Sequence, residues 1–196
     1  DLHDMPQQLY AGNITKLSEK TQGQLLIKEY PTASDHSGHF KSLMNELALK
    51  KSFRPDVIFI DYLNICASSR FKGGNISSYF YVKAIAEELR GLAVEFNVPI
   101  FSATQTTRTG YVSTDIGLED TSESFGLPAT ADFMFALISN EELEALGQMK
   151  VKQLKNRYND PSINRAFIIG VDRAKMRLYD VQQKAQDIVD ANQVDE

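Results

Sequence analysis

The sequence predicts an α/β fold: a mostly parallel, twisted sheet with helices on both faces and antiparallel strands toward the C-terminus. Unbroken apolar runs of strand length recur at 57–60, 98–101 and 132–138. Such runs are typical of strands buried on both faces. Helical patterns lie between the early runs, and this alternation of strand and helix favours parallel pairing.

The first hundred residues alternate between the two patterns. Helices are expected at 7–20, 34–51 and 79–97, the last being the strongest helical pattern in the sequence. Strands are expected at 24–31, 57–61 and 98–104. Pro31 stops the first strand, and Asp35 or Ser37 is expected to cap the second helix.

The second half begins with a long polar stretch at 105–131, which predicts a functional or irregular segment. Strands are then expected at 132–139, 149–158, 163–172 and, as an edge strand, 175–181. A short helix capped by Asn140 interrupts them. Residues 1–181 would thus form one domain, followed by a mobile acidic tail at 182–196.

The composition is that of a soluble globular protein, with 42% hydrophobic and 24% charged residues among 196. No run approaches the roughly 18 apolar residues of a membrane helix, and no signal peptide is visible. Because Cys66 is the single cysteine, an intrachain disulfide is excluded and a reducing, cytoplasmic location is expected. A net charge of −5 argues against a domain that is basic all over, although a local basic lining could still bind nucleic acid.

Two polar groups follow the buried strands, at the edge where parallel sheets bind ligands. Asp61 follows four apolar residues, which is the Walker B form, where a carboxylate holds magnesium beside nucleotide phosphates. Gln105 follows the next strand and could sense a γ-phosphate or orient water. A helix cap or loop anchor for Asp61, and an ordinary loop amide for Gln105, are the alternatives.

Lys155 and Arg157 form a second candidate group. Their spacing of two on a strand places both cations on one side, where they suit a phosphate. A solvated basic face is the alternative.

The remaining reactive residues carry less. His36 and His39 lie beside Asp35, but helix capping explains them better than a metal site does, and Cys66 has no histidine near it in the sequence. The chain contains no G-x-x-x-x-G-K followed by Ser or Thr, the phosphate-binding loop. Either the protein is not a P-loop enzyme, or that loop precedes Asp1, since a chain that opens without methionine is expected to be a piece of something longer.

Four ordered segments carry a resemblance: "RPDVIFIDYLNIC", "VKAIAEELRGLAVEFNVPIFSATQTTR", "ESFGLPATADFMFALI" and "KQLKNRYND". Together, over about residues 24–181, they resemble the C-terminal RecA-like motor domain of DnaB-type replicative DNA helicases, in the wording found in T-even-like bacteriophages. The resemblance implies that Asp61 is the Walker B aspartate, with ATP and Mg²⁺ as cofactors. It implies that Gln105 contacts the γ-phosphate and that Lys155 and Arg157 are a K-x-R finger reaching a neighbouring subunit's ATP site.

The resemblance also implies DNA-binding loops. The segment 122–126 aligns with a channel loop that often reads R-E-S-G, but this chain has Ser where Arg is usual and Phe where a small residue is usual. The loop at 67–78 is a second candidate. The residues expected to contact DNA are Arg70, Lys72, Arg108, Ser122, Glu123, Phe125 and Gly126.

For the parent protein, the resemblance implies a homo-hexamer that couples ATP hydrolysis to 5′→3′ movement on single-stranded DNA, with a primase and a helicase loader as partners and no membrane. The family's P-loop and catalytic Glu precede Walker B and are not in the sequence. Residues 1–181 would therefore be a partial motor domain that is inactive alone. A RecA-like recombinase or other ATPase, and a non-enzymatic scaffold, remain the alternatives.

Overall fold

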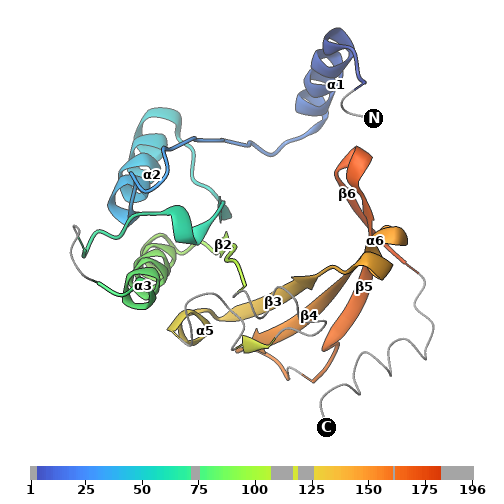
Figure 1. Cartoon of the computed structure of the whole chain (residues 1–196). Coiled ribbons are helices and arrows are strands. Elements are labelled where there is room, and N and C mark those ends of the chain that lie inside the picture. Colours follow the sequence, from blue (N-terminus) through green and yellow to red (C-terminus); the bar gives the residue numbers. More distant parts are fainter. Residues whose placement is uncertain (1–3, 72–75, 107–116, 119–125, 161, 182–196) are drawn as a thin grey trace.

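The computed structural model describes residues 4–71, 76–106, 117–118, 126–160 and 162–181. Two sheets form from these residues (Figure 1). In the first, β1 (Ile58–Ile60) pairs in parallel with β2 (Ile100–Ser102). The second is antiparallel, in the order β3 (Phe133–Ile138), β4 (Gln148–Asn156), β5 (Ala166–Asp172) and β6 (Arg177–Asp180).

The predicted α/β class is confirmed, and so are the antiparallel strands toward the C-terminus. The expectation of a mostly parallel sheet needs correction for the described residues, because their parallel part is a single two-stranded ladder. The second sheet is the larger one because β3 to β6 are joined by short connections, which can only link antiparallel neighbours.

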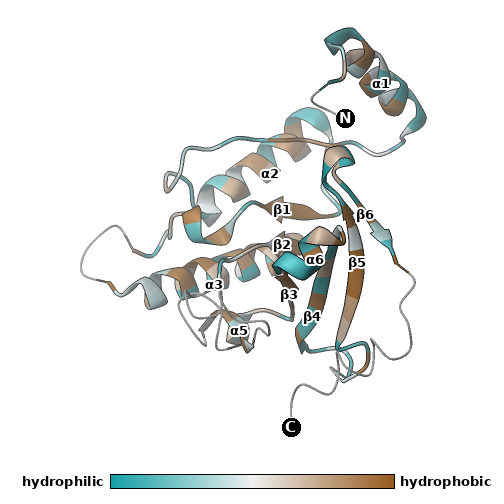
Figure 2. Cartoon of the chain, turned by 45° about the vertical axis from the view of Figure 1, so that its right-hand side comes forward, coloured by the Kyte–Doolittle hydropathy of each residue, from teal (hydrophilic) through white to brown (hydrophobic). Residues whose placement is uncertain are grey.

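The helices are α1 (Gln7–Lys20), α2 (Ser37–Lys51), α3 (Ser78–Phe96), α5 (Gly126–Thr130) and α6 (Glu141–Ala145), with 3₁₀ turns at Leu63–Ile65 and Arg173–Lys175. Helix α1 has no buried residue and stands apart from the rest, joined to α2 by an extended segment (Figures 1 and 2). Helix α3 is the structural centre, since it packs against α2, α5, β2 and the turn at 63–65.

Two apolar clusters form along α3. One joins its buried face, centred on Ile85 at 1% exposure, to Leu63, Cys66 and Leu127. The other joins Leu92 to residues of α2 and the start of β2. These clusters fix β1 and β2 against the helices and thereby position the ends of both strands.

The predicted strand at 24–31 is wrong. The segment has no ladder partner in the described structure, and Leu25 and Ile27 are 87% and 84% exposed. An extended segment becomes a strand only when a neighbour completes its hydrogen bonds. For the same reason β1 is covered on one face only: Phe59 is 73% exposed and stacks on Phe101 at 5.3 Å between ring centroids.

The predicted cap of α2 also needs correction. His36, rather than Asp35 or Ser37, is the N-cap: its Nδ1 accepts from the Gly38 backbone N–H at 3.0 Å, and His39 returns the contact to the His36 backbone. The Asn140 cap is confirmed, since its side chain accepts from the Leu143 N–H at 2.8 Å.

Candidate functional site

The ends of β1 and β2 form the first part of the candidate site. The two strands are parallel neighbours, as the sequence predicted, with Ile60 opposite Ser102. Asp61 follows β1 directly and is exposed, and its peptide bond to Tyr62 is cis. Gln105 Nε2 donates to the Tyr62 hydroxyl at 3.2 Å. The carboxylate and the amide therefore lie at the same edge of the parallel pair.

Backbone and side-chain contacts hold this edge together. Ser102 Oγ donates to the carbonyl of Ile60 at 2.8 Å, and the Leu63 N–H donates to the carbonyl of Ala103 at 3.2 Å. Next to them, Thr104 Oγ1 donates to Asn64 Oδ1 at 2.8 Å. These bonds lock the two strand ends in register, so the position of Gln105 depends on that of β1.

The oxygens at this edge fit a hard cation. Asp61 supplies an exposed carboxylate, and hydroxyl and amide oxygens lie on the adjacent residues. Among the residues that the structure describes, no three His, Cys, Asp or Glu side chains gather to hold a metal. One carboxylate is enough for Mg²⁺, which keeps several waters and binds substrate phosphates rather than an all-protein cage.

Lys155 and Arg157 lie at the end of β4, where a bulge in β3 disturbs the ladder. Lys155 Nζ donates to the carbonyl of Pro128 at 2.6 Å, and Arg157 Nη1 lies 2.8 Å from Asp132 Oδ1. Both cations thus contact the segment 128–132. Partial burial and the nearby Arg157 lower the pKa of Lys155, although Asp132 opposes this. The Arg157 side chain remains 46% exposed.

The candidate DNA-binding residues are only partly described. Arg70 forms an ion pair with Glu87 at 2.5 Å on α3, and its side chain is half exposed. Gly126 is buried at the start of α5, where an added Cβ would lie 3.1–3.3 Å from the Lys83 side chain. This burial corrects the expectation of a surface contact there, because the close approach to α3 gives Gly126 a packing role. Lys72, Arg108, Ser122, Glu123 and Phe125 lie outside the described residues.

Glu88 is a positioning residue that the sequence did not reveal. Its carboxylate accepts hydrogen bonds from Ser68 Oγ at 2.6 Å, from Ser37 Oγ at 2.8 Å and from the Ser69 N–H. Desolvation alone would raise the pKa of Glu88, but these hydrogen bonds outweigh it and lower the pKa to about 2. Glu88 therefore fastens the start of the loop that carries Arg70 to α2 and α3.

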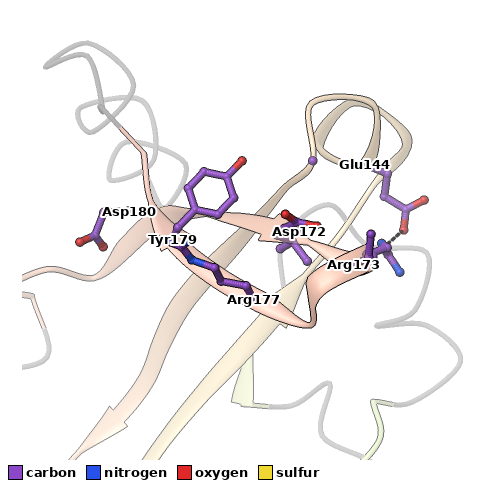
Figure 3. Close-up of a pocket in the computed structure, with 9 residues that line it drawn as sticks. Glu144, Asp172, Arg173, Arg177, Tyr179 and Asp180 are labelled. Carbon is purple, nitrogen blue, oxygen red and sulfur yellow. Dashed lines mark hydrogen bonds and ion pairs between the residues drawn. The ribbon is translucent and has the colours of Figure 1, made fainter. Parts of the chain in front are cut away.

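Other parts of the molecule do not join this site. A hollow of about 820 Å³ lies at the far end of the antiparallel sheet, lined by Tyr179 and by Arg173, which pairs with Glu144 at 3.2 Å (Figure 3). None of the predicted site residues lines it. Cys66 is buried, and desolvation followed by the charge of Asp35 raises the pKa of its thiol. None of the described helices is both long and apolar enough to cross a membrane.

The fold defines the class of protein. The chain superposes on a solved helicase ATPase domain with a TM-score of 0.71 over 92% of this chain and 63% of that one, at 16% identity. It superposes with a TM-score of 0.70, also at 16% identity, on a structure titled "The Structure Of A DnaB-Like Replicative Helicase And Its Interactions With Primase", covering 91% of this chain and 43% of that one. The fold is therefore that of a RecA-like helicase ATPase domain, as predicted.

The sequence comparison is more specific. The chain is 45% identical over 175 residues to the "DnaB-like replicative helicase" of Enterobacteria phage T4. The match covers 89% of this chain and 37% of that relative, so the chain spans little more than a third of the relative's length. No family model matches. The predicted resemblance to the DnaB-like replicative helicases is thereby confirmed.

Proposed function

We propose that this chain is part of a hexameric replicative helicase that couples ATP hydrolysis to 5′→3′ movement on single-stranded DNA. The observation that carries the proposal is the juxtaposition of Asp61 and Gln105 at one edge of the parallel pair, with Gln105 hydrogen-bonded to Tyr62. The identity to the phage T4 protein supports it. Single-stranded DNA, a primase and a helicase loader are the proposed partners, in the cytoplasm of an infected bacterial cell.

At the strand edge, Asp61 would hold Mg²⁺ through water. When bound, the ion would neutralise charge on the ATP phosphates. Gln105 would donate an amide N–H to the γ-phosphate or orient the attacking water. Because Gln105 also contacts Tyr62, directly after Asp61, a change at the nucleotide would be felt at the end of β2, where the chain continues toward the candidate DNA-binding loop.

Lys155 and Arg157 would act on the ATP of a neighbouring subunit. A guanidinium offers five donors in a planar fork, which suits phosphate oxygens, and Lys adds a second positive charge. Arg157 is the more exposed of the two and can present donors outward. Such a finger makes hydrolysis depend on assembly.

The 196 residues contain no phosphate-binding P-loop sequence. We therefore expect the 196-residue chain to bind ATP weakly and to hydrolyse none. Magnesium-dependent turnover by this purified chain would contradict that expectation.

The central experiment uses the assembled parent protein. Asp61→Asn should abolish magnesium-dependent ATP hydrolysis, because the amide loses the charge that positions the metal. The matched control is Asp56→Asn, an exposed aspartate just before the same strand, which should leave the rate unchanged. A wild-type rate in Asp61→Asn would refute the assignment.

The finger is tested by mixing subunits. Arg157→Ala should lower the rate by a factor on the order of 10³. Mixed rings of Arg157→Ala and Asp61→Asn subunits should regain activity, because some interfaces then pair an intact Asp61 with an intact Arg157. No recovery on mixing, with rings still assembled, would contradict a role in trans.

A further inference from the structure

We infer that Asp132 is the positioning residue that orients the Arg157 guanidinium for its neighbour's phosphates. The inference rests on the proposed function. Asp132 lies between α5 and β3, and its carboxylate is shared by two arginines from different elements. Arg90 reaches it from α3, and Arg157 reaches it from the end of β4.

The two arginines are held differently. Arg90 Nη1 lies 2.7 Å from Asp132 Oδ2 and 2.7 Å from the carbonyl of Thr130, and it donates to both. Arg157 Nη1 lies 2.8 Å from the other oxygen, Oδ1, but without the alignment of a hydrogen bond. Arg90 therefore fixes Asp132 from two points, while Arg157 has a close ionic contact that can be exchanged for another anion.

The backbone supports the same arrangement. The Arg157 N–H donates to the carbonyl of Asp132 at 3.0 Å, so the residue is registered on Asp132 by its main chain as well as its side chain. The guanidinium contacts the carboxylate through one Nη1 and remains 46% exposed. The donors that Asp132 does not contact can therefore face outward.

The charges in this cluster explain why the contact can be released. One carboxylate, Asp132, stands among Arg90, Arg157 and Lys155. If Arg157 turns to a phosphate, Asp132 keeps Arg90 as its partner, and no carboxylate is left unpaired. The excess positive charge on this face also favours a neighbouring anion.

The test measures ATP hydrolysis by the assembled full-length protein. Asp132→Asn preserves shape and an oxygen for Arg90 but removes the charge that holds Arg157. We expect kcat to fall by about tenfold to a hundredfold, with KM for ATP within about twofold, because orientation is lost while ATP binding is kept. In an Arg157→Ala background, Asp132→Asn should cause no further loss.

Two further variants separate positioning from a general role in folding. Glu144→Gln removes the carboxylate partner of another arginine, Arg173, and should leave kcat and KM unchanged. Arg90→Lys keeps the charge but loses the shared contact with Thr130 and Asp132, so its smaller loss of kcat should also vanish when Arg157 is absent. This second variant decides the question if Asp132→Asn does not fold.

The outcomes are distinct. An unchanged kcat in Asp132→Asn, or an equal loss with and without Arg157, overturns the positioning role while leaving the finger intact. An unchanged rate in Arg157→Ala overturns the finger itself and the inference with it. Loss of kcat that depends on Arg157, at constant KM, supports the inference.

Discussion

Glu88→Gln should destabilise the chain in a pH-dependent manner. Hydrogen bonds outweigh desolvation and hold the pKa of Glu88 at about 2, against an ordinary value of 4.5. At about 1.36 kcal/mol per pKa unit, this difference would amount to roughly 3 kcal/mol. Because Glu88 is only partly buried, solvent screening reduces the figure, and we expect a loss of about 1–2 kcal/mol at pH 7.

The sign of the pH dependence follows from the direction of the shift. A carboxyl whose pKa is lower in the folded state stabilises the fold above the unfolded pKa, here 4.5, and that stability is lost as the pH falls through the folded pKa of about 2. The difference between wild type and Glu88→Gln should therefore be constant from pH 7 to about 5. It should shrink by about half by pH 3.

Urea unfolding of both proteins, followed by circular dichroism at each pH, measures this difference. Glu46→Gln is the control. Glu46 is a fully exposed carboxylate paired with Lys50 at 2.8 Å on α2, so its loss should leave the free energy of unfolding nearly unchanged. A Glu88→Gln effect that stays the same from pH 7 to pH 3 would show that shape, rather than ionised hydrogen bonding, makes Glu88 important.

Two predictions concern packing. Ile85→Ala should lower the free energy of unfolding by about 3–4 kcal/mol in urea titrations, because Ile85 is 1% exposed in the main cluster and leaves a cavity; a loss below about 1 kcal/mol would contradict this. Gly170→Ala should cost about 1–3 kcal/mol, because its Cβ would overlap the Tyr179 ring on β6. Gly91→Ala on α3, with nothing within 4 Å of the new Cβ, is the control and should stabilise by about 0.5–1 kcal/mol.

Patterns within one element predicted most of the fold. The period of α3 and the apolar runs of β1 and β3 are local, so their positions followed from the sequence. The segment 24–31 has an equally good strand pattern, yet it forms no ladder, because strand formation depends on a partner elsewhere in the chain. The His36 cap was missed for a different reason: Asp35 and Ser37, on either side of it, are more common caps, and a ring nitrogen fills that role only when the backbone turn places it there.

The candidate site divides in the same way. Asp61 and Gln105 could be found because each directly follows an apolar strand, and parallel strands end at one edge. Glu88 and Asp132 could not be found by this reasoning, since their partners come from distant parts of the chain, 68–70 and 157. Glu88 sits in an ordinary charged stretch of a helix, where a solvated carboxylate is the usual expectation.

Helix α3 connects these two anchoring residues. Glu88 and Arg90 are two positions apart, so their side chains leave the helix about 200° from each other. Glu88 holds the start of the loop that carries Arg70, while Arg90 holds Asp132, the partner of Arg157. Between them, Leu89 is buried in the main cluster and ties the helix to the core. A shift of α3 as a rigid body would therefore move the base of the candidate DNA-binding loop and the support of the proposed finger together, which gives DNA contact a physical route to the ATP site of a neighbouring subunit.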